Sequence, residues 1–209
     1  MGVRAEQKER TRQTLVNVAL DMVAQGRSFD SLSLREVTRA AGVVPTAFYR
    51  HFRNMDELGM AIVGEVLPRL REHLQELRRS GEEPEQMLRN IVTFFFDFVS
   101  RHQREFQFYG REIAGGSPAL RNALRMETFN FTRELADDLV SMGVGEGLDS
   151  NERLTVADLI VRLMLTTTQD LLELHNHGMV LDNLHERTVK QLRIILSGVV
   201  QWSRHSEAS

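Results

Sequence analysis

The stretch SLSLREVTRAAGVVPTAFYRHF, residues 31–52, constrains the fold of this 209-residue chain more than any other segment. Ser33 can cap a helix, and Glu36, three residues later, can complete a capping box. Apolar residues at helical spacing follow, and Gly42 then supplies the permissive backbone that a sharp turn needs. Pro45 stands where a second helix would begin, because its missing N–H costs little in a first turn. The pattern predicts two short helices joined by a tight turn.

The second predicted helix carries donors of a size that can reach base edges and phosphates, namely Thr46, Tyr49, Arg50 and His51. This layout is that of a helix-turn-helix, whose second helix lies in the DNA major groove. DNA presents a dense row of phosphates, so binding needs donors at several points along one face of the protein. The segment therefore predicts a DNA-reading element, although each donor taken alone could be an ordinary solvated surface group.

The first of the two short helices and the N-terminus add further candidates. We assign Ser33 and Arg35, at the start of that helix, to the phosphate backbone, where a helix N-terminus also favours anions. Arg4 is expected in a disordered arm, and such arms can enter the minor groove. Phe48 and Phe52 are expected in the core rather than stacked on bases.

Charge is distributed unevenly along the chain. The formal net charge is −3, but residues 1–53 contain nine Lys and Arg against five Asp and Glu, which is 9 − 5 = +4. The remainder therefore carries −3 − 4 = −7. An asymmetry of this kind suggests a nucleic-acid surface at one end of the chain, chance fluctuation being the alternative.

The same residues resemble the TetR family of bacterial transcriptional regulators. The string FYRHF after an AAGV turn is typical of that family's recognition helix and its exit, and the length and helical remainder also match. The opening MGVRAEQKERTR with SFDSLSLREVTRAAG is similar to the FabR/DesT subgroup. That resemblance implies control of unsaturated fatty-acid synthesis genes and a response to long-chain acyl-CoA.

The resemblance also implies roles for single residues. Thr46, Ala47 and Tyr49 would face the groove, His51 would lie near a phosphate, and Arg50 would face the DNA or brace the domain. Binding would be to a palindromic operator in double-stranded DNA, by a homodimer. The complete set of expected DNA-binding residues is Arg4, Ser33, Arg35, Thr46, Ala47, Tyr49, Arg50 and His51.

Helical periodicity extends over the rest of the chain, and strand-like alternation is scarce. We expect an all-α protein of about nine helices, with a three-helix DNA-binding domain at 1–53 and a helical ligand-binding and dimerisation domain at 54–209. Pro68 lies inside a long helical pattern and predicts a kink or a hinge. The expected helices are about 4–24, the two short ones, 54–79, 85–101, 103–113, 118–142, 150–176 and 182–204.

Aromatic residues are dense between residues 91 and 131. Phe94, Phe95 and Phe96 in a row cannot all be buried on one narrow stripe, so some must face a cavity or a partner helix. From composition alone an ordinary packed core is the simpler interpretation for most of these aromatics, and it is the family resemblance that favours a cavity for an apolar effector. The expected ligand-binding residues are Phe94, Phe95, Phe98, Phe106, Tyr109, Met126, Phe129, Leu163 and Met164. Arg101, Arg104 and Arg111 could meet the polar part of an acyl-CoA or be solvated.

The last two predicted helices carry apolar stripes that could pack as a four-helix bundle between two chains. Packing within one chain is the competing interpretation, and Val200 and Trp202 are expected to be exposed. The stripes are Val156, Ile160, Leu163 and Thr167, and then Val189, Leu192, Leu196 and Val199.

Several functional classes lack support in the sequence. There is no Cys, so thiol chemistry and thiolate metal sites are excluded, which fits a reducing cytoplasm. No motif arranges a catalytic nucleophile, so we expect no enzyme and no cofactor. No apolar run is long enough to span a membrane. The His175-Asn176-His177 triplet and His185 give only a weak metal signal, and surface histidines are the simpler interpretation, so no metal is expected.

A ligand-responsive transcriptional repressor is therefore the predicted function. The alternative within that class is a TetR-like repressor that senses another hydrophobic small molecule, such as a drug. A lipid carrier or small enzyme with an accidental helix-turn-helix pattern is the competing class, and specific DNA retention separates the two.

Overall fold

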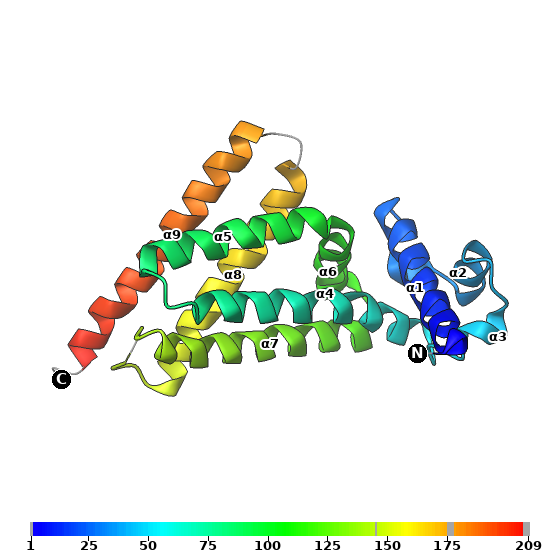
Figure 1. Ribbon diagram of the computed structural model, residues 1–209, viewed down its shortest axis with the longest axis horizontal. Helices are drawn as coiled ribbons and strands as arrows, with labels where there is room; N and C mark the ends of the chain where they lie inside the picture. The colour runs from blue at the N-terminus through cyan, green and yellow to red at the C-terminus, as the bar shows by residue number, and fades with distance from the viewer. Residues whose placement is uncertain (1, 145, 175–177, 207–209) are drawn as a thin grey trace. The chain divides into compact units, whose positions relative to one another are not determined.

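The computed structural model describes residues 2–144, 146–174 and 178–206. Across these residues it contains nine α-helices, one 3-10 turn and no β-strand (Figure 1), which confirms the all-α class. The elements are α1 (Val3–Ala24), the 3-10 turn η1 (Phe29–Ser31), α2 (Leu34–Ala40), α3 (Pro45–Phe48), α4 (Met55–Arg78), α5 (Pro84–Arg101), α6 (Gln103–Gly115), α7 (Pro118–Ser141), α8 (Ser150–Leu174) and α9 (Gly178–Ser206).

Several helices begin with a side-chain cap, whereas α1, α3 and α5 have none. The amide of Glu57 donates to Asn54 Oδ1 at 2.9 Å before α4, and the amide of Leu120 donates to Ser117 Oγ at 3.2 Å before α7. The sequence predicts a second capping box, formed by Asn54 and Glu57, and it is only half formed, because the Glu57 carboxylate accepts from the amide of Arg53 instead of that of Asn54. The last helix begins at Gly178, earlier than the expected start at about residue 182.

The chain folds into two compact units. The N-terminal unit comprises residues 1–68 and 103–125, and the C-terminal unit comprises residues 69–102 and 126–209. The chain passes between them three times, namely inside α4 directly after the exposed Pro68, between α5 and α6, and inside α7. The division of function at residue 53 remains a prediction, as does a hinge at Pro68.

The core of the N-terminal unit is built on aromatic side chains that are almost fully buried. Phe29 of η1 meets Phe108 of α6 edge to face, with 5.2 Å between ring centroids. Gly59 of α4 allows this approach, because a Cβ there would lie 2.9 Å from the Phe29 ring. Two polar contacts also hold α6 to α1, since the Arg104 guanidinium pairs with Asp21 and that of Arg111 donates to the Val23 carbonyl at 2.7 Å.

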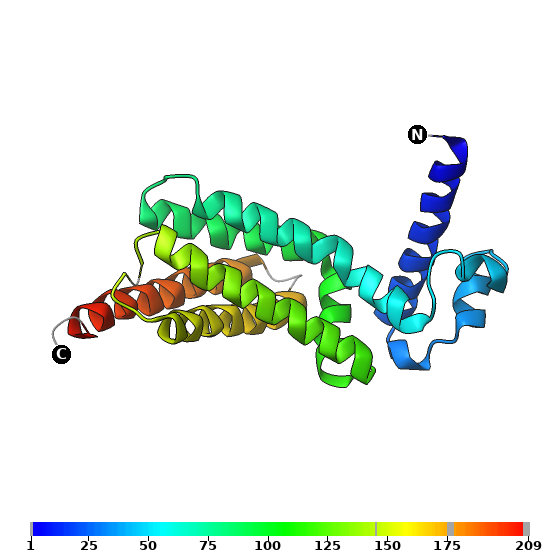
Figure 2. The ribbon, with the colours of Figure 1, turned by 90° about the horizontal axis from the view of Figure 1, so that it is seen from below.

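The C-terminal unit packs the last halves of α4 and α7 with α5, α8 and α9. Figures 1 and 2 both show α8 beside α9, and α5 contacts both of them. One core cluster joins α7 to α8 and consists of Leu135, Ala136, Leu139, Ala157 and Val161. Within the part of the chain that the structure describes, no helix combines the length and apolarity needed to cross a bilayer.

Candidate functional site

The predicted capping box at the start of α2 is formed. The amide of Glu36 donates to Ser33 Oγ at 3.3 Å, and the amide of Ser33 donates to Glu36 Oε2 at 3.0 Å. Arg27 adds an ion pair to the other carboxylate oxygen at 3.0 Å. The Ser33 hydroxyl, which donates to Glu36, is the main reason that the pKa of Glu36 falls to about 2, and the backbone of Ser33 and the Arg27 side chain act in the same direction. The start of α2 is thus held in one geometry.

The turn between α2 and α3 also follows the expected chemistry. Gly42 has φ of 67°, in the left-handed region that residues with a Cβ avoid. The amide of Val43 closes the turn on the Thr38 carbonyl at 2.9 Å. Pro45 occupies the first position of α3, which is a single short turn of helix.

The side chains of α3 and the residues that follow it divide into two sets. Phe48 is fully buried and Phe52 is 2% exposed, so both belong to the core, as expected. Thr46 and Arg50 are exposed, Tyr49 is 63% exposed, and Ala47 and His51 are half-buried. The buried phenylalanines therefore anchor this segment while its polar side chains face outward.

Arg4 differs from the expectation of a disordered arm. It lies in the first turns of α1, which already begins at Val3, and its side chain is exposed. Lys8 follows at a spacing of four residues, which brings the two cations to the same face of α1. Arg12 instead serves the fold, because its guanidinium pairs with Glu65 at 2.6 Å and lies 5.4 Å from the centre of the Phe52 ring.

His51 lies in positive surroundings. Its Nδ1 is buried and has no hydrogen-bond partner. Partial burial lowers the pKa of His51, and the charges of Lys8 and Arg12 lower it further. Sequence reasoning did not include Lys8 among the residues near this segment. The i, i+4 spacing of Arg4 and Lys8, which places both on one face of α1, is the signal that could have added Lys8 to the candidates. Lys8 and Arg12 of α1 thus both act on His51, at the end of the helix-turn-helix.

Replacing Ser33 with alanine should lower the free energy of unfolding by about 0.5–2 kcal/mol, because α2 loses its capping acceptor. It should also raise the pKa of Glu36, which loses its largest stabilising hydrogen bond. In the wild type, the contribution of ionised Glu36 is present above its ordinary value of 4.5 and is lost as the pH falls towards about 2. Urea unfolding at several pH values measures both effects.

Ser28→Ala is the matched control, because Ser28 precedes η1 without a side-chain capping bond. Equal losses of stability from the two substitutions would contradict the capping role of Ser33.

The three consecutive phenylalanines of α5 face different neighbours, as their spacing requires. Phe94 stacks on His73 of α4, with 4.9 Å between ring centroids and 7° between ring planes, and it also contacts Phe98. Phe95 is 5% exposed. Phe96 meets His185 of α9 edge to face at 5.2 Å. Partner helices within the C-terminal unit thus account for the contacts of Phe94 and Phe96.

The other expected ligand residues are divided between the two units. Phe106 and Tyr109 are buried in the N-terminal unit. Met126 and Phe129 are 57% and 46% exposed on α7 of the C-terminal unit, where Leu163 and Met164 are half-buried on α8. Arg104 and Arg111, considered above for an acyl-CoA, instead bind α1.

The C-terminal unit contains a pocket of about 670 Å³ that none of the expected ligand residues lines. Its wall combines charged and apolar side chains, and one side is the buried pair of Arg78 with Asp138, 2.6 Å apart. The lining residues are Arg78, Arg79, Gly81, Glu82, Pro84, Met87, Asp137, Asp138, Ser141 and Met142. An apolar wall was expected, and this pocket has a mixed one.

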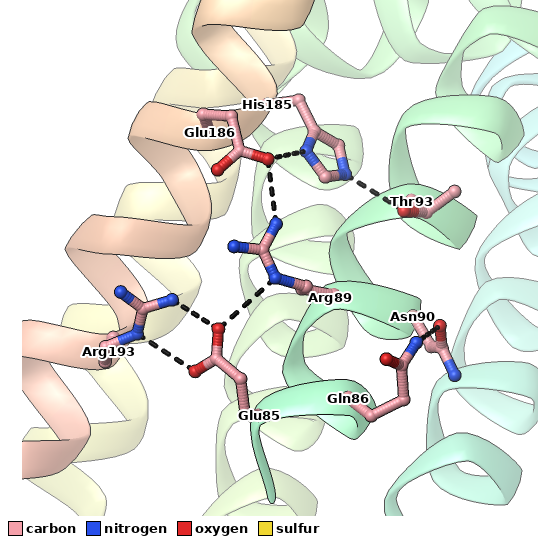
Figure 3. Close-up of polar contacts among 8 residues, drawn as sticks. All are labelled: Glu85, Gln86, Arg89, Asn90, Thr93, His185, Glu186 and Arg193. Carbon is pink, nitrogen blue, oxygen red and sulfur yellow. Dashed lines mark hydrogen bonds and ion pairs between the residues drawn. The ribbon is translucent and has the colours of Figure 1, made fainter.

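A series of polar contacts joins α5 to α9 (Figure 3). Arg89 lies between two carboxylates, 3.3 Å from Glu85 and 2.8 Å from Glu186. Glu85 also pairs with Arg193 of α9, which ends this series of polar contacts. His185 Nε2 lies 2.9 Å from the Thr93 hydroxyl. These groups are mostly exposed, so each pair alone contributes little to stability. Together, the several pairs fix the orientation of α9 against α5.

The stripes expected to join two chains are largely used inside one chain. Val189, Leu192 and Val199 of α9 are buried, and Val156, Ile160 and Leu196 pack on the α7–α8 cluster. Packing within the chain is therefore the correct interpretation for these residues. The apolar side chains left exposed on the same two helices are Leu159, Val180, Ile194, Val200 and Trp202.

The histidines considered for metal binding are placed differently. His175 and His177 lie outside the described residues. His185 contacts Thr93 and Phe96. Over residues 2–144, 146–174 and 178–206, no three His, Cys, Asp or Glu side chains gather closely enough to hold a metal ion.

Comparison with known proteins finds a family match at the N-terminus and solved structures with a similar fold. Residues 18–62 match the family described as bacterial regulatory proteins, tetR family. The fatty acid degradation regulator FadR from Bacillus halodurans shares 16% identity at a TM-score of 0.64, over 88% of this chain and 96% of that one. FadR from Bacillus subtilis in complex with stearoyl-CoA shares 15% identity at 0.67, over 90% and 98%. A TetR family regulator from Chloroflexus aurantiacus shares 18% at 0.57, over 91% and 93%.

Proposed function

We propose that this chain, a TetR-family transcriptional regulator by its N-terminal domain and its fold, represses genes of unsaturated fatty-acid synthesis in response to long-chain acyl-CoA. It would bind a palindromic operator as a homodimer in the cytoplasm. The subgroup is the FabR/DesT-like one that the N-terminal motifs resemble. The runner-up is a regulator of the same family that senses another hydrophobic compound, such as a drug.

The observation that carries the DNA-binding part is the opposite exposure of neighbouring side chains at α3. Phe48 is fully buried, while Tyr49, the next residue in the chain, is 63% exposed. A side chain next to an immobile anchor has few conformations to lose on binding, which favours specific readout. Thr46 would read bases with Tyr49, while Arg35 and Ser33 would contact phosphates.

Tyr49→Ala and Thr46→Ala should each weaken specific binding by about 1–3 kcal/mol and leave binding to random DNA almost unchanged. Arg35→Ala should instead weaken binding to both and reduce the salt slope by about one. Gel-shift titrations at several salt concentrations, on an operator selected from a random pool, measure these quantities. Tyr49→Phe separates the hydroxyl from the ring, and Arg101→Ala is a control for surface charge. Equal losses on both DNAs would reject base reading by Tyr49.

Homodimerisation is supported by apolar side chains that remain exposed on α8 and α9. Ile194 and Trp202 are each 63% exposed, and Gly198 lies between them at the helical spacing of four. A Cβ on Gly198 would meet nothing within 4 Å, so the glycine leaves room for another helix to approach. Leu159 adds an exposed apolar residue on α8. A two-fold pair of such faces would match the symmetry of a palindrome.

The fatty-acid role is supported by the N-terminal resemblance and by the named functions of the FadR structures. Apolar side chains on α7 that a ligand could cover are Met126 and Phe129. Binding of an acyl chain would bury this surface, and each buried methylene contributes about 0.8 kcal/mol. Chain length should therefore change affinity in regular steps.

Calorimetry with oleoyl-CoA, palmitoyl-CoA and free CoA tests the effector. We expect acyl-CoA to bind at micromolar concentration or tighter and free CoA to bind much more weakly. Phe129→Ala should weaken acyl-CoA binding, whereas Val140→Ala, at an equally exposed position of α7, should not. Absence of binding at tens of micromolar would remove acyl-CoA and favour the runner-up, which a screen of hydrophobic drugs would then address.

A further inference from the structure

Glu112 of α6 is a buried carboxyl group, and no cation among the residues that the structure describes forms an ion pair with it. Its residue surface is only 3% exposed, and its Oε2 has no hydrogen-bond partner. The adjacent Arg111 directs its guanidinium to the Val23 carbonyl instead. An isolated carboxylate is very costly to bury, and a group in such a position takes up a proton rather than remain charged.

The carboxyl group lies between η1 and the turn that links α6 to α7. It accepts a hydrogen bond from the backbone amide of Phe29. On its other side is Gly116, where a Cβ would lie 2.5 Å from Oε2, so the unpaired oxygen is packed directly on backbone. The Gly116 carbonyl is in turn bonded by Arg121. The geometry leaves little room for the hydration that a charged form needs.

The charged groups around Glu112 come from every element near it. Asp30 of η1 disfavours ionisation, and Arg111 of α6 favours it. Arg121 of α7 is engaged with Gly116, and Asp56 of α4 accepts from the Ser117 hydroxyl at 2.6 Å. Burial raises the pKa of Glu112 most and Asp30 raises it further, and together they outweigh the Phe29 amide and Arg111, which lower it.

Phe29, whose backbone amide faces Glu112, is well placed to affect the DNA-binding element. Phe29 packs on Phe108 and precedes the capping residue Ser33 by four positions. The same loop is held from the other side by Arg27, which donates to the Ser31 carbonyl at 3.4 Å and pairs with Glu36. Displacement of Phe29 would therefore move the start of α2.

We propose that Glu112 is held as a neutral carboxylic acid between η1 and the α6–α7 turn, and that loss of its proton loosens the helix-turn-helix, because the buried, unpaired oxygen can be hydrated only if these elements separate. The effect on DNA binding rests on the proposed function, but the effect on the N-terminal unit does not. Because the folded state holds this proton more tightly than the unfolded state, the stabilisation is complete at acidic pH. It is lost as the pH rises through the raised pKa of Glu112.

NMR of ¹³C-labelled glutamate carboxyls tests the protonation directly. We expect one carboxyl to titrate above all others, and that resonance to be absent from Glu112→Gln. Asp30→Asn should move this titration to lower pH, because it removes a neighbouring negative charge. Titration of Glu112 at or below its ordinary value of 4.5 would overturn the proposal.

Stability provides the second measurement. Between about pH 5 and about pH 8 the wild-type Tm should fall by roughly 2–4 °C more than that of Glu112→Gln. Amide hydrogen exchange at Phe29 should accelerate over the same range in the wild type only. Glu76→Gln, an exposed carboxylate of α4, should behave as the wild type. Parallel pH profiles of Tm for the wild type and Glu112→Gln would overturn the proposal.

DNA affinity is then measured as the ratio of wild type to Glu112→Gln across the same pH range. This ratio should decline as the pH rises, because Gln keeps the acceptor for the Phe29 amide and cannot ionise. Loss of all specific DNA binding in both proteins would count against the proposed function and leave the NMR and exchange results to decide the role of Glu112.

Discussion

Ile194→Glu should convert the proposed homodimer into monomers and lower operator affinity by about 10²–10⁴-fold, the factor that two linked binding modules commonly provide. Ile194 is 63% exposed and shares a face of α9 with Gly198 and Trp202. A glutamate from each chain near a two-fold axis would bring like charges together and leave them poorly hydrated. Each monomer would then bind one half-site with the affinity of a single helix-turn-helix.

Light scattering at micromolar concentration and gel shifts on full and half operators measure the two effects. Val140→Glu is the control, because it introduces the same charge at an exposed apolar position of α7. A dimeric Ile194→Glu protein, or a wild type that is monomeric at micromolar concentration, would contradict the assignment of this face.

Arg78→Ala should lower the free energy of unfolding by about 3–5 kcal/mol, because it leaves a buried carboxylate without its partner. The side chains of Arg78 and Asp138 are only 5% and 7% exposed, and their closest atoms are 2.6 Å apart. Arg79 also lies 3.6 Å from Asp138, but its side chain is 62% exposed and too hydrated to replace the lost partner fully.

Two further variants separate burial from simple loss of an ion pair. Arg162→Ala breaks a pair of the same length with Asp158 on the surface of α8, and should cost no more than about 0.5 kcal/mol. Replacing Arg78 by Met together with Asp138 by Leu should restore much of the stability, since no buried charge then remains. Urea unfolding compares all four proteins. Similar losses from Arg78→Ala and Arg162→Ala would refute the explanation by burial.

Local chemistry explains why the helix-turn-helix could be predicted in detail. The capping box of α2, the left-handed Gly42 and the proline at the start of α3 each depend on residues at most four positions apart. The same reasoning separated the buried Phe48 from the exposed Tyr49, because their spacing sends them to different sides of a short helix. Arg4 was assigned to a disordered arm, although the helical pattern expected from about residue 4 already included it, and α1 begins at Val3.

The effector region could not be predicted to the same degree. A run of apolar residues has the same composition whether it lines a cavity or packs a core. The destinations of Phe94 and Phe96 depend on His73 and His185, which are distant in sequence. For the same reason the stripe of Val189, Leu192 and Val199 proved to be internal to the chain.

By itself, the sequence determined the helical class, the caps and turns of the helix-turn-helix and the polar side chains it presents, because hydrogen bonds between near neighbours decide these features. Only the tertiary structure decided which apolar faces are buried, that Arg78 meets Asp138 across 60 positions, and that Glu112 lies against Phe29 without a counter-ion. Burial and long-range pairing depend on which helices pack together, and that choice is made by the whole core.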